Sequence, residues 1–115
     1  MDKDWKYPLI DYNKSGRLLF IALYAMNISP KDAAEYLGYS EYRTIYKWKA
    51  GRSLPNLENL YAFSRLVGIP MDMLIIGEDE NWKYEKALKL IRIAAYFTRI
   101  KISIGDIEDF ILQRQ

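Results

Sequence analysis

Three glycines divide much of the chain into short segments, and their spacing constrains the fold more than any other feature of the sequence. Gly38, Gly51 and Gly68 each follow a segment of helical periodicity, at the position where a left-handed residue commonly ends a helix. Pro30 and Pro55 stand near the start of the next segments. Proline is tolerated there because the backbone N–H that it lacks would have no hydrogen-bond partner within the helix. The sequence therefore predicts an all-α domain of short helices joined by tight turns.

Local signals place the first two helices. Residues 16–26 are expected to form a helix that is apolar on every side, with Ser15 as its N-cap and Asn27 as a left-handed stop. Ser29 followed by Pro30 is a start signal, because Ser caps free amides and Pro suits the first helical position. The second helix is expected to end at Leu37 and Gly38.

Two more helices follow, and a brief helical turn after them. Residues 42–50 are predicted to be the third helix, stopped by Gly51. Leu54-Pro55-Asn56 opens a fourth helix, which Gly68 ends. Residues 70–76 form the brief apolar turn. The fourth helix shows the spacing of a half-buried helix, with its apolar face assigned to Leu57, Leu60, Tyr61, Ser64 and Val67.

The two ends of the chain carry many apolar residues for their length. Residues 1–14 are predicted to be a docked N-terminal arm. Residues 78–115 are predicted to be a helical hairpin: a helix over about residues 81–101, then a helix over 106–113 opened by Ser103 with Asp106. The apolar surface of the longer helix is assigned to Trp82, Leu88, Ile91, Ala94, Ala95 and Ile102.

Composition excludes most kinds of active site. The chain contains no Cys and no His, which removes disulfides, thiolate nucleophiles, imidazole bases and most zinc sites. It shows no acids paired within an apolar stretch and no Gly-rich phosphate loop. We therefore expect a protein that is not an enzyme and uses no cofactor or metal. The longest apolar run, Leu18 to Met26, is about half the length of a membrane span, and the lack of Cys fits a reducing cytoplasm.

The positive charge is local. The net charge is only +2, from 17 basic and 15 acidic residues, which is a weak argument for nucleic acid. The segment from Arg43 to Arg52, however, also contains Lys47 and Lys49 and no acid. A cationic face on the third helix is therefore expected.

A helical wheel of ~100° per residue separates the third helix into two faces. Ile45 and Trp48 fall on the buried side, so we expect Trp48 in the core and not as a platform for bases. Composition alone would favour a solvated face on the other side. That face carries two cations, a small residue and an aromatic hydroxyl: Arg43, Lys47, Ala50 and Tyr46.

Two short helices about a turn, closed by a glycine, form the helix-turn-helix pattern, whose second helix enters the major groove of DNA. The strings Leu37-Gly38-Tyr39-Ser40, Ile45-Tyr46-Lys47-Trp48, Gly51-Arg52-Ser53-Leu54-Pro55 and Glu58-Asn59-Leu60 resemble the phage-repressor (Cro/repressor, XRE) type of this family over roughly residues 7–77. The resemblance implies an all-α, five-helix DNA-binding domain and a role as a transcriptional regulator. We therefore expect this domain over residues 15–77, followed by the predicted C-terminal hairpin, and a cytoplasmic protein that acts as a repressor.

The resemblance and the wheel together assign DNA contacts. Arg43 lies near the helix start and has the fork that pairs with guanine, and Lys47 is assigned to a base or a phosphate. Lys49 stands where members commonly have Glu, and Pro30 where many have a phosphate-contacting Gln. Phosphate contacts are assigned to residues that flank the third helix, although Asn56 is equally well explained as a cap. The full set is Ser40, Tyr42, Arg43, Thr44, Tyr46, Lys47, Arg52, Ser53 and Asn56.

The excess of apolar residues predicts a partner. A first helix that is apolar all round would expose a flank carrying Phe20, Leu23 and Tyr24, which the C-terminal hairpin is expected to cover, within one chain or between two. A homodimer through helix 1 and residues 82–113 is expected, with a monomeric core as the alternative. Two other functions remain open: a protein-interaction module, antitoxin-like or adaptor-like, that uses the same surfaces, and a regulator gated by a small molecule bound between the tail and helix 1.

Overall fold

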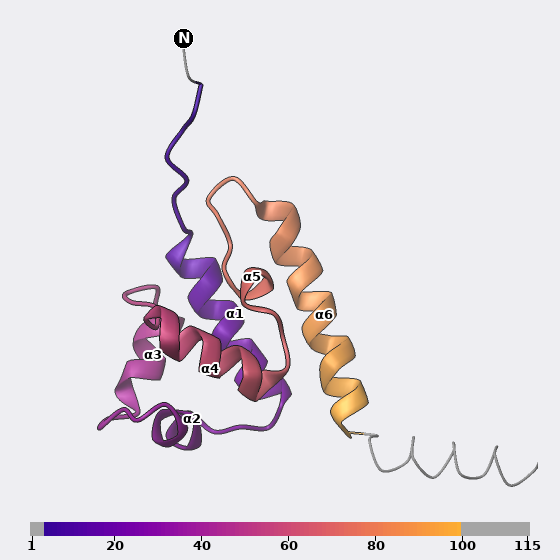
Figure 1. Cartoon of the computed structure of the whole chain (residues 1–115). Coiled ribbons are helices and arrows are strands. Elements are labelled where there is room, and N and C mark those ends of the chain that lie inside the picture. The colour runs from indigo at the N-terminus through magenta and orange to yellow at the C-terminus, as the bar shows by residue number, and fades with distance from the viewer. Residues whose placement is uncertain (1–3, 100–115) are drawn as a thin grey trace, which may run out of the picture.

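The computed structural model describes residues 4–99, and within them the chain is all-α, as predicted. The expected helix over 106–113 and its capping pair lie outside the described residues. Figure 1 shows α1 at the centre, with α3 on one side of it and α6 on the other. The helices are α1 (Tyr12–Ala25), α2 (Pro30–Tyr36), α3 (Arg43–Lys49), α4 (Leu57–Val67), α5 (Met71–Leu74) and α6 (Asn81–Arg99).

The start of α1 corrects the sequence prediction. The helix begins at Tyr12, and its N-cap is Asp11, whose carboxylate accepts a hydrogen bond from the Lys14 N–H at 2.9 Å. Ser15, the expected cap, lies inside the helix and is fully buried. Its hydroxyl accepts from the Ile76 N–H at 2.8 Å and donates to the Ile76 carbonyl at 3.3 Å. Both residues are good caps, and the long-range pairing with Ile76 decides between them.

The core is built around α1. This helix contacts α3, α5 and α6, but it is not packed all round as the sequence predicted, because one side of it stays exposed. The flank expected to be exposed is only partly so, because Leu23 is buried and Phe20 half-buried, while Tyr24 is 81% exposed. The fully buried residues of α1 include Leu18, Leu19 and Ala22.

The buried face of α4 differs from the expected one. Asn56 caps the helix by accepting from the Asn59 N–H at 2.8 Å, and Gly68 ends it at a φ of +73°. Leu57 and Tyr61 are exposed, contrary to the prediction. The buried row is rotated relative to them, because the helix presents another set of residues to Trp48 and the rest of the core. This set is Leu60, Phe63, Ser64 and Val67.

The long helix α6 packs against α1 and α5 within the same chain. Its buried row is Ala87, Ile91 and Ala95, whereas Trp82 is 58% exposed and so does not contribute to the buried surface as expected. Lys83 takes the buried position one residue further on. Helix α6 therefore folds back on α1, and the second helix predicted for the hairpin lies outside the described residues.

The linker before α6 is held by Glu80. Its carboxylate accepts from the Gly77 N–H at 2.9 Å and forms an ion pair with buried Lys83 at 3.2 Å. Asp72 of α5 lies 3.6 Å from the same ammonium. The Gly77 hydrogen bond, and then Lys83, lower the pKa of Glu80 below its ordinary value. The ionised carboxylate is therefore part of the connection between the first five helices and α6.

The arm is shorter than predicted and is docked through its backbone. Residues 4–10 precede α1, and Ile10 forms an isolated antiparallel bridge with Gly77. The Glu78 N–H donates to the Leu9 carbonyl at 2.9 Å. The side chain of Tyr7 is 87% exposed, so the aromatic docking expected for the arm is wrong at this position. None of the described helices is long and apolar enough to cross a membrane.

Candidate nucleic-acid interface

The connection between α2 and α3 follows the signals in the sequence. Ser29 caps α2 by accepting from the Asp32 N–H at 3.0 Å, as predicted. Gly38 then adopts a φ of +78°, and the Tyr39 N–H donates to the Ala34 carbonyl at 2.9 Å. A left-handed residue at this point is natural for Gly, because a Cβ would be strained there. The turn sets the direction in which α3 leaves α2.

The inner face of α3 is fixed by two residues with no exposed surface. Ile45 and Trp48 are each 0% exposed, which confirms the prediction that the indole belongs to the core. The Trp48 ring lies edge-on to Phe63, with ring centroids 5.8 Å apart. Gly16 of α1 brings the two helices into backbone contact, since a Cβ there would lie 1.8 Å from the Trp48 carbonyl oxygen. Helix α3 therefore cannot rotate or slide without disrupting the core.

The outer face of α3 is exposed and cationic. Arg43, Tyr46 and Lys47 are exposed, as the helical wheel predicted. Gly51 ends the helix at a φ of +74°, and the Arg52 N–H donates to the Lys47 carbonyl at 2.9 Å, which folds Arg52 back beside α3. One hollow of about 370 Å³ is lined by Arg43, Tyr46, Lys47, Ala50 and Arg52.

No acidic side chain among residues 4–99 forms an ion pair with this surface. Between Gly38 and Asn56 the sequence contains one acidic residue, Glu41, and it does not line the hollow. Within residues 4–99, the ion pairs join Lys83 to Asp72 and Glu80, so none involves Arg43, Lys47 or Arg52. Three cations around one hollow therefore keep their charge available to an anionic partner.

The remaining predicted contacts lie around the hollow and not in it. Ser40 and Tyr42 are exposed at the start of α3, and the Tyr42 ring lies 6.1 Å from that of Tyr46. Thr44 and Ser53 are half-buried. Asn56 is the cap of α4, which confirms its structural role. Within the described residues, no cluster of acidic side chains is suited to a metal ion.

Sequence reasoning missed one supporting contact. The Phe20 ring of α1 lies 5.5 Å from the Tyr46 ring, and the Lys49 ammonium lies 4.6 Å from the Phe20 centroid. A cation this close to a ring face is attracted by its quadrupole. The sequence signal for this contact was the unbroken apolar character of the first helix. It indicates that Phe20 packs against another residue but does not say which one. The contact holds Tyr46 at the edge of the hollow.

The comparisons with known proteins give one match. A family model described as Helix-turn-helix matches residues 22–74. No curated protein matches, and no solved structure matches. The matched region contains α2 to α5 and the last residues of α1, and leaves the arm and α6 outside.

Proposed function

Because residues 22–74 form a helix-turn-helix domain of the Cro/repressor, XRE-like type, we propose that this DNA-binding regulator is a repressor that reads the major groove with α3. The observation that carries the proposal is the exposed hollow of Arg43, Lys47 and Arg52 on a helix whose other face is locked by Trp48. A rigid cationic helix suits groove binding, because its side chains are held in register with base edges. A cytoplasmic protein is expected, as from the sequence.

The proposed roles follow from position. Arg43 lies in the first turn of α3, where side chains reach base edges, and its fork matches guanine O6 and N7. Lys47 lies one turn later on the same face and binds a base or a phosphate. Tyr42, Thr44 and Tyr46 border these two cations and contact the walls of the groove. Base contacts specify the sequence, so Arg43 is the main determinant of specificity.

Phosphate contacts are proposed for residues on either side of α3. Ser40 precedes the helix, while Arg52, Ser53 and Asn56 follow it. Their groups donate hydrogen bonds of the kind that position a protein on the DNA backbone without reading sequence. With four to six phosphates neutralised, the slope of log affinity against log salt is expected to be about −4 to −5.

The experiment begins by selecting bound fragments from random DNA with the full chain. On the selected site, Arg43→Ala is expected to relax preference at particular base pairs by about 1–3 kcal/mol each. Lys47→Ala and Arg52→Ala are expected to weaken binding to all sequences and to reduce the salt slope by about 1 each. Arg65→Ala is the matched control, since this exposed arginine lies on α4, away from both α3 and the exposed face of α6. Full affinity in all three α3-region variants would refute the proposal.

A homodimer is proposed through the outer face of α6. This face exposes more than half of each of four large side chains, Trp82, Ile93, Tyr96 and Phe97. Ile93, Tyr96 and Phe97 lie within one turn or so of each other near the end of α6, where the Tyr96 and Phe97 rings are 5.8 Å apart, and exposed apolar groups of this kind are typical of interaction sites. A second copy supplies a second α3, and two reader helices about one DNA turn apart, ~34 Å, double the contacted sequence.

Light scattering on the full chain tests the dimer. Ile93→Glu and Phe97→Glu are expected to convert a dimer into a monomer and to weaken DNA binding, whereas Tyr61→Glu, an equally exposed apolar position on α4, is expected to do neither. A wild-type protein that is monomeric at every concentration would refute the dimer. The face would then be assigned to a different protein, the interaction-module function that the sequence left open.

A further inference from the structure

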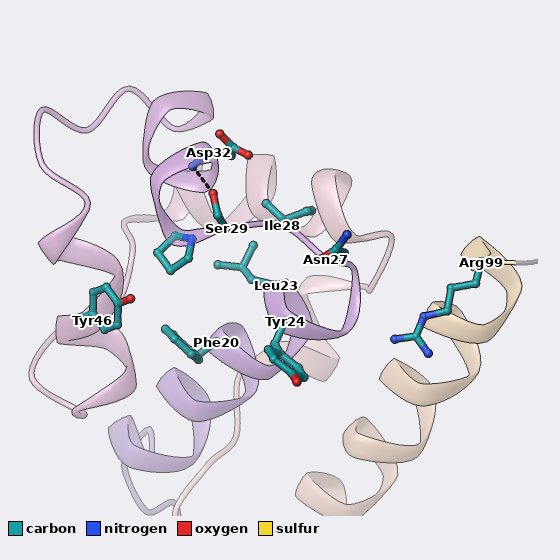
Figure 2. A pocket seen from close by; sticks show the side chains of 10 residues that line it. Phe20, Leu23, Tyr24, Asn27, Ile28, Ser29, Asp32, Tyr46 and Arg99 are labelled. Carbon is teal, nitrogen blue, oxygen red and sulfur yellow. Dashed lines mark hydrogen bonds between the residues drawn. The ribbon is translucent and has the colours of Figure 1, made fainter.

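A second cavity lies beside the reader helix, with a volume of about 590 Å³. It is partly open to solvent and is lined by the end of α1, the start of α2, the outer side of α3 and the last described residue of α6 (Figure 2). Its size falls within the range of small-molecule sites, ~300–1,000 Å³. The proposed function uses Tyr46 from this lining and none of the rest.

Aromatic rings and aliphatic groups form most of the walls. Phe20 and Tyr24 of α1 and Tyr46 of α3 present three rings toward the same space. Leu23 and Ile28 add aliphatic groups to the lining. Rings placed in this way favour a flat apolar ligand, because offset and edge-to-face contacts add to the burial of apolar area.

One cation stands at the rim. The Arg99 guanidinium points toward Tyr24 in Figure 2 and donates a long hydrogen bond, 3.4 Å, to the Ala25 carbonyl. Among residues 4–99 no carboxylate forms an ion pair with it. Asp32 is the one acid of the lining, and Figure 2 places it at the opposite end, on α2. The guanidinium therefore keeps donors for a ligand carboxylate, which it binds best in a two-pronged geometry.

We propose that this cavity binds a small aromatic carboxylic acid of two or three fused or linked rings. The rings of the acid pack among Phe20, Tyr24 and Tyr46, and its carboxylate pairs with Arg99. A polar donor at the far end of the ligand would face Asp32. A ligand without flat rings would not pack among the three aromatic side chains, and a ligand without a negative charge would not pair with Arg99.

Tyr46 links this cavity to the DNA-binding surface. Its ring lines both the 590 Å³ cavity and the cationic hollow of about 370 Å³. A ligand packed against one side of the ring shifts that ring, which borders the surface proposed for DNA. The acid is therefore an effector that weakens DNA binding. This consequence rests on the proposed function, whereas the binding of the acid does not.

The binding experiment uses the full chain and two probes with the same ring system and opposite charge, naphthylacetate and naphthylethylamine. Calorimetric titration is expected to show saturable binding of naphthylacetate and at least tenfold weaker binding of the amine. Arg99→Gln is expected to weaken naphthylacetate about tenfold or more, as for the loss of a charged hydrogen bond, and Tyr24→Ala several-fold. Arg92→Gln and Tyr61→Ala, which remove the same groups elsewhere on the surface, are expected to bind as the wild type does.

Three outcomes overturn the proposal. Equal binding of the two probes, or wild-type affinity in Arg99→Gln, removes the role of the carboxylate. If no heat of binding is measured up to millimolar naphthylacetate, the cavity is not a site for this acid. Apparent affinity that falls as protein concentration rises assigns the cavity to a second copy of the chain.

A separate titration tests the coupling. Naphthylacetate at saturation is expected to lower the affinity for the selected DNA at least several-fold in the wild type and to leave it unchanged in Arg99→Gln. Unchanged DNA affinity in the wild type, with naphthylacetate bound, overturns the effector role alone. A protein that binds naphthylacetate but no DNA sequence overturns the proposed function and leaves the site standing.

Discussion

A single methyl group added at Gly16 is expected to destabilise the protein, although it lies inside a helix where Ala is normally the better residue. Gly16 is buried in α1 against α3. A Cβ at this position would lie 1.8 Å from the Trp48 carbonyl oxygen and 2.6 Å from its carbon. Both neighbours are backbone atoms, so no side chain can turn away to make room.

The magnitude follows from two opposing effects. Replacing Gly by Ala in a helix favours folding by about 1 kcal/mol. Against this, α1 and α3 must separate by about 1.6 Å at this point to restore an ordinary contact of 3.4 Å. Overpacking of a well-packed core typically costs about 1–3 kcal/mol, and the backbone contact places this site at or above the upper end. The expected net loss for Gly16→Ala is about 2 kcal/mol or more.

Thermal unfolding of Gly16→Ala checks this expectation. At roughly 4 °C per kcal/mol for a domain of this size, Tm should fall by about 8 °C or more. Arg17→Ala is the control, because this neighbouring side chain is exposed and its change reports helix propensity alone. A variant as stable as the wild type, or more stable, would show that α1 and α3 are not in backbone contact.

Three further outcomes are expected. Ser15→Ala leaves the buried N–H and carbonyl of Ile76 without their side-chain partner and should lower the free energy of unfolding in urea by about 1–3 kcal/mol. The pKa of Glu80 is lowered chiefly by the hydrogen bond from the Gly77 N–H, so the ionised carboxylate stabilises the fold above its ordinary pKa of 4.5, and this contribution is lost as the pH falls through the lowered value. The difference in unfolding free energy between wild type and Glu80→Gln should therefore disappear on acidification. A difference that grows on acidification would refute the assignment. Asn56→Asp should keep the cap and the stability while weakening DNA binding, whereas Asn56→Ala should lose about 1 kcal/mol of stability. If both Asn56 variants bind DNA as tightly as the wild type does, Asn56 does not contact DNA and its role is only to cap α4.

The sequence located the parts of the fold that depend on neighbouring residues. Ser29 as a cap, Asn27 and Gly51 as left-handed residues, and the two faces of α3 were all predicted and are all present. Each depends on interactions within a few residues, such as a side chain reaching an amide of its own helix or the periodicity of one turn. Such signals are readable because the partner is fixed by the chain.

The candidate site was predicted only in part for the same reason. The wheel placed Arg43 and Lys47 together, but it did not show that Arg52 folds back to complete the hollow, nor that Phe20 supports Tyr46 from α1. The expected burial of Leu57, Tyr61 and Trp82 was wrong because periodicity gives the spacing of an apolar face and not its orientation. Orientation is set by the neighbouring helices.

The sequence by itself determined that short helices would form, where most of them start and stop, and which side of the third helix would face outward. Only the tertiary structure decided that Asp11 and not Ser15 caps the first helix, that Gly16 must lack a side chain, and that Arg99 meets the aromatic rings of α1 and α3 at one cavity. The physical reason is that these features join residues far apart in the chain, and their energies arise only once the helices have packed.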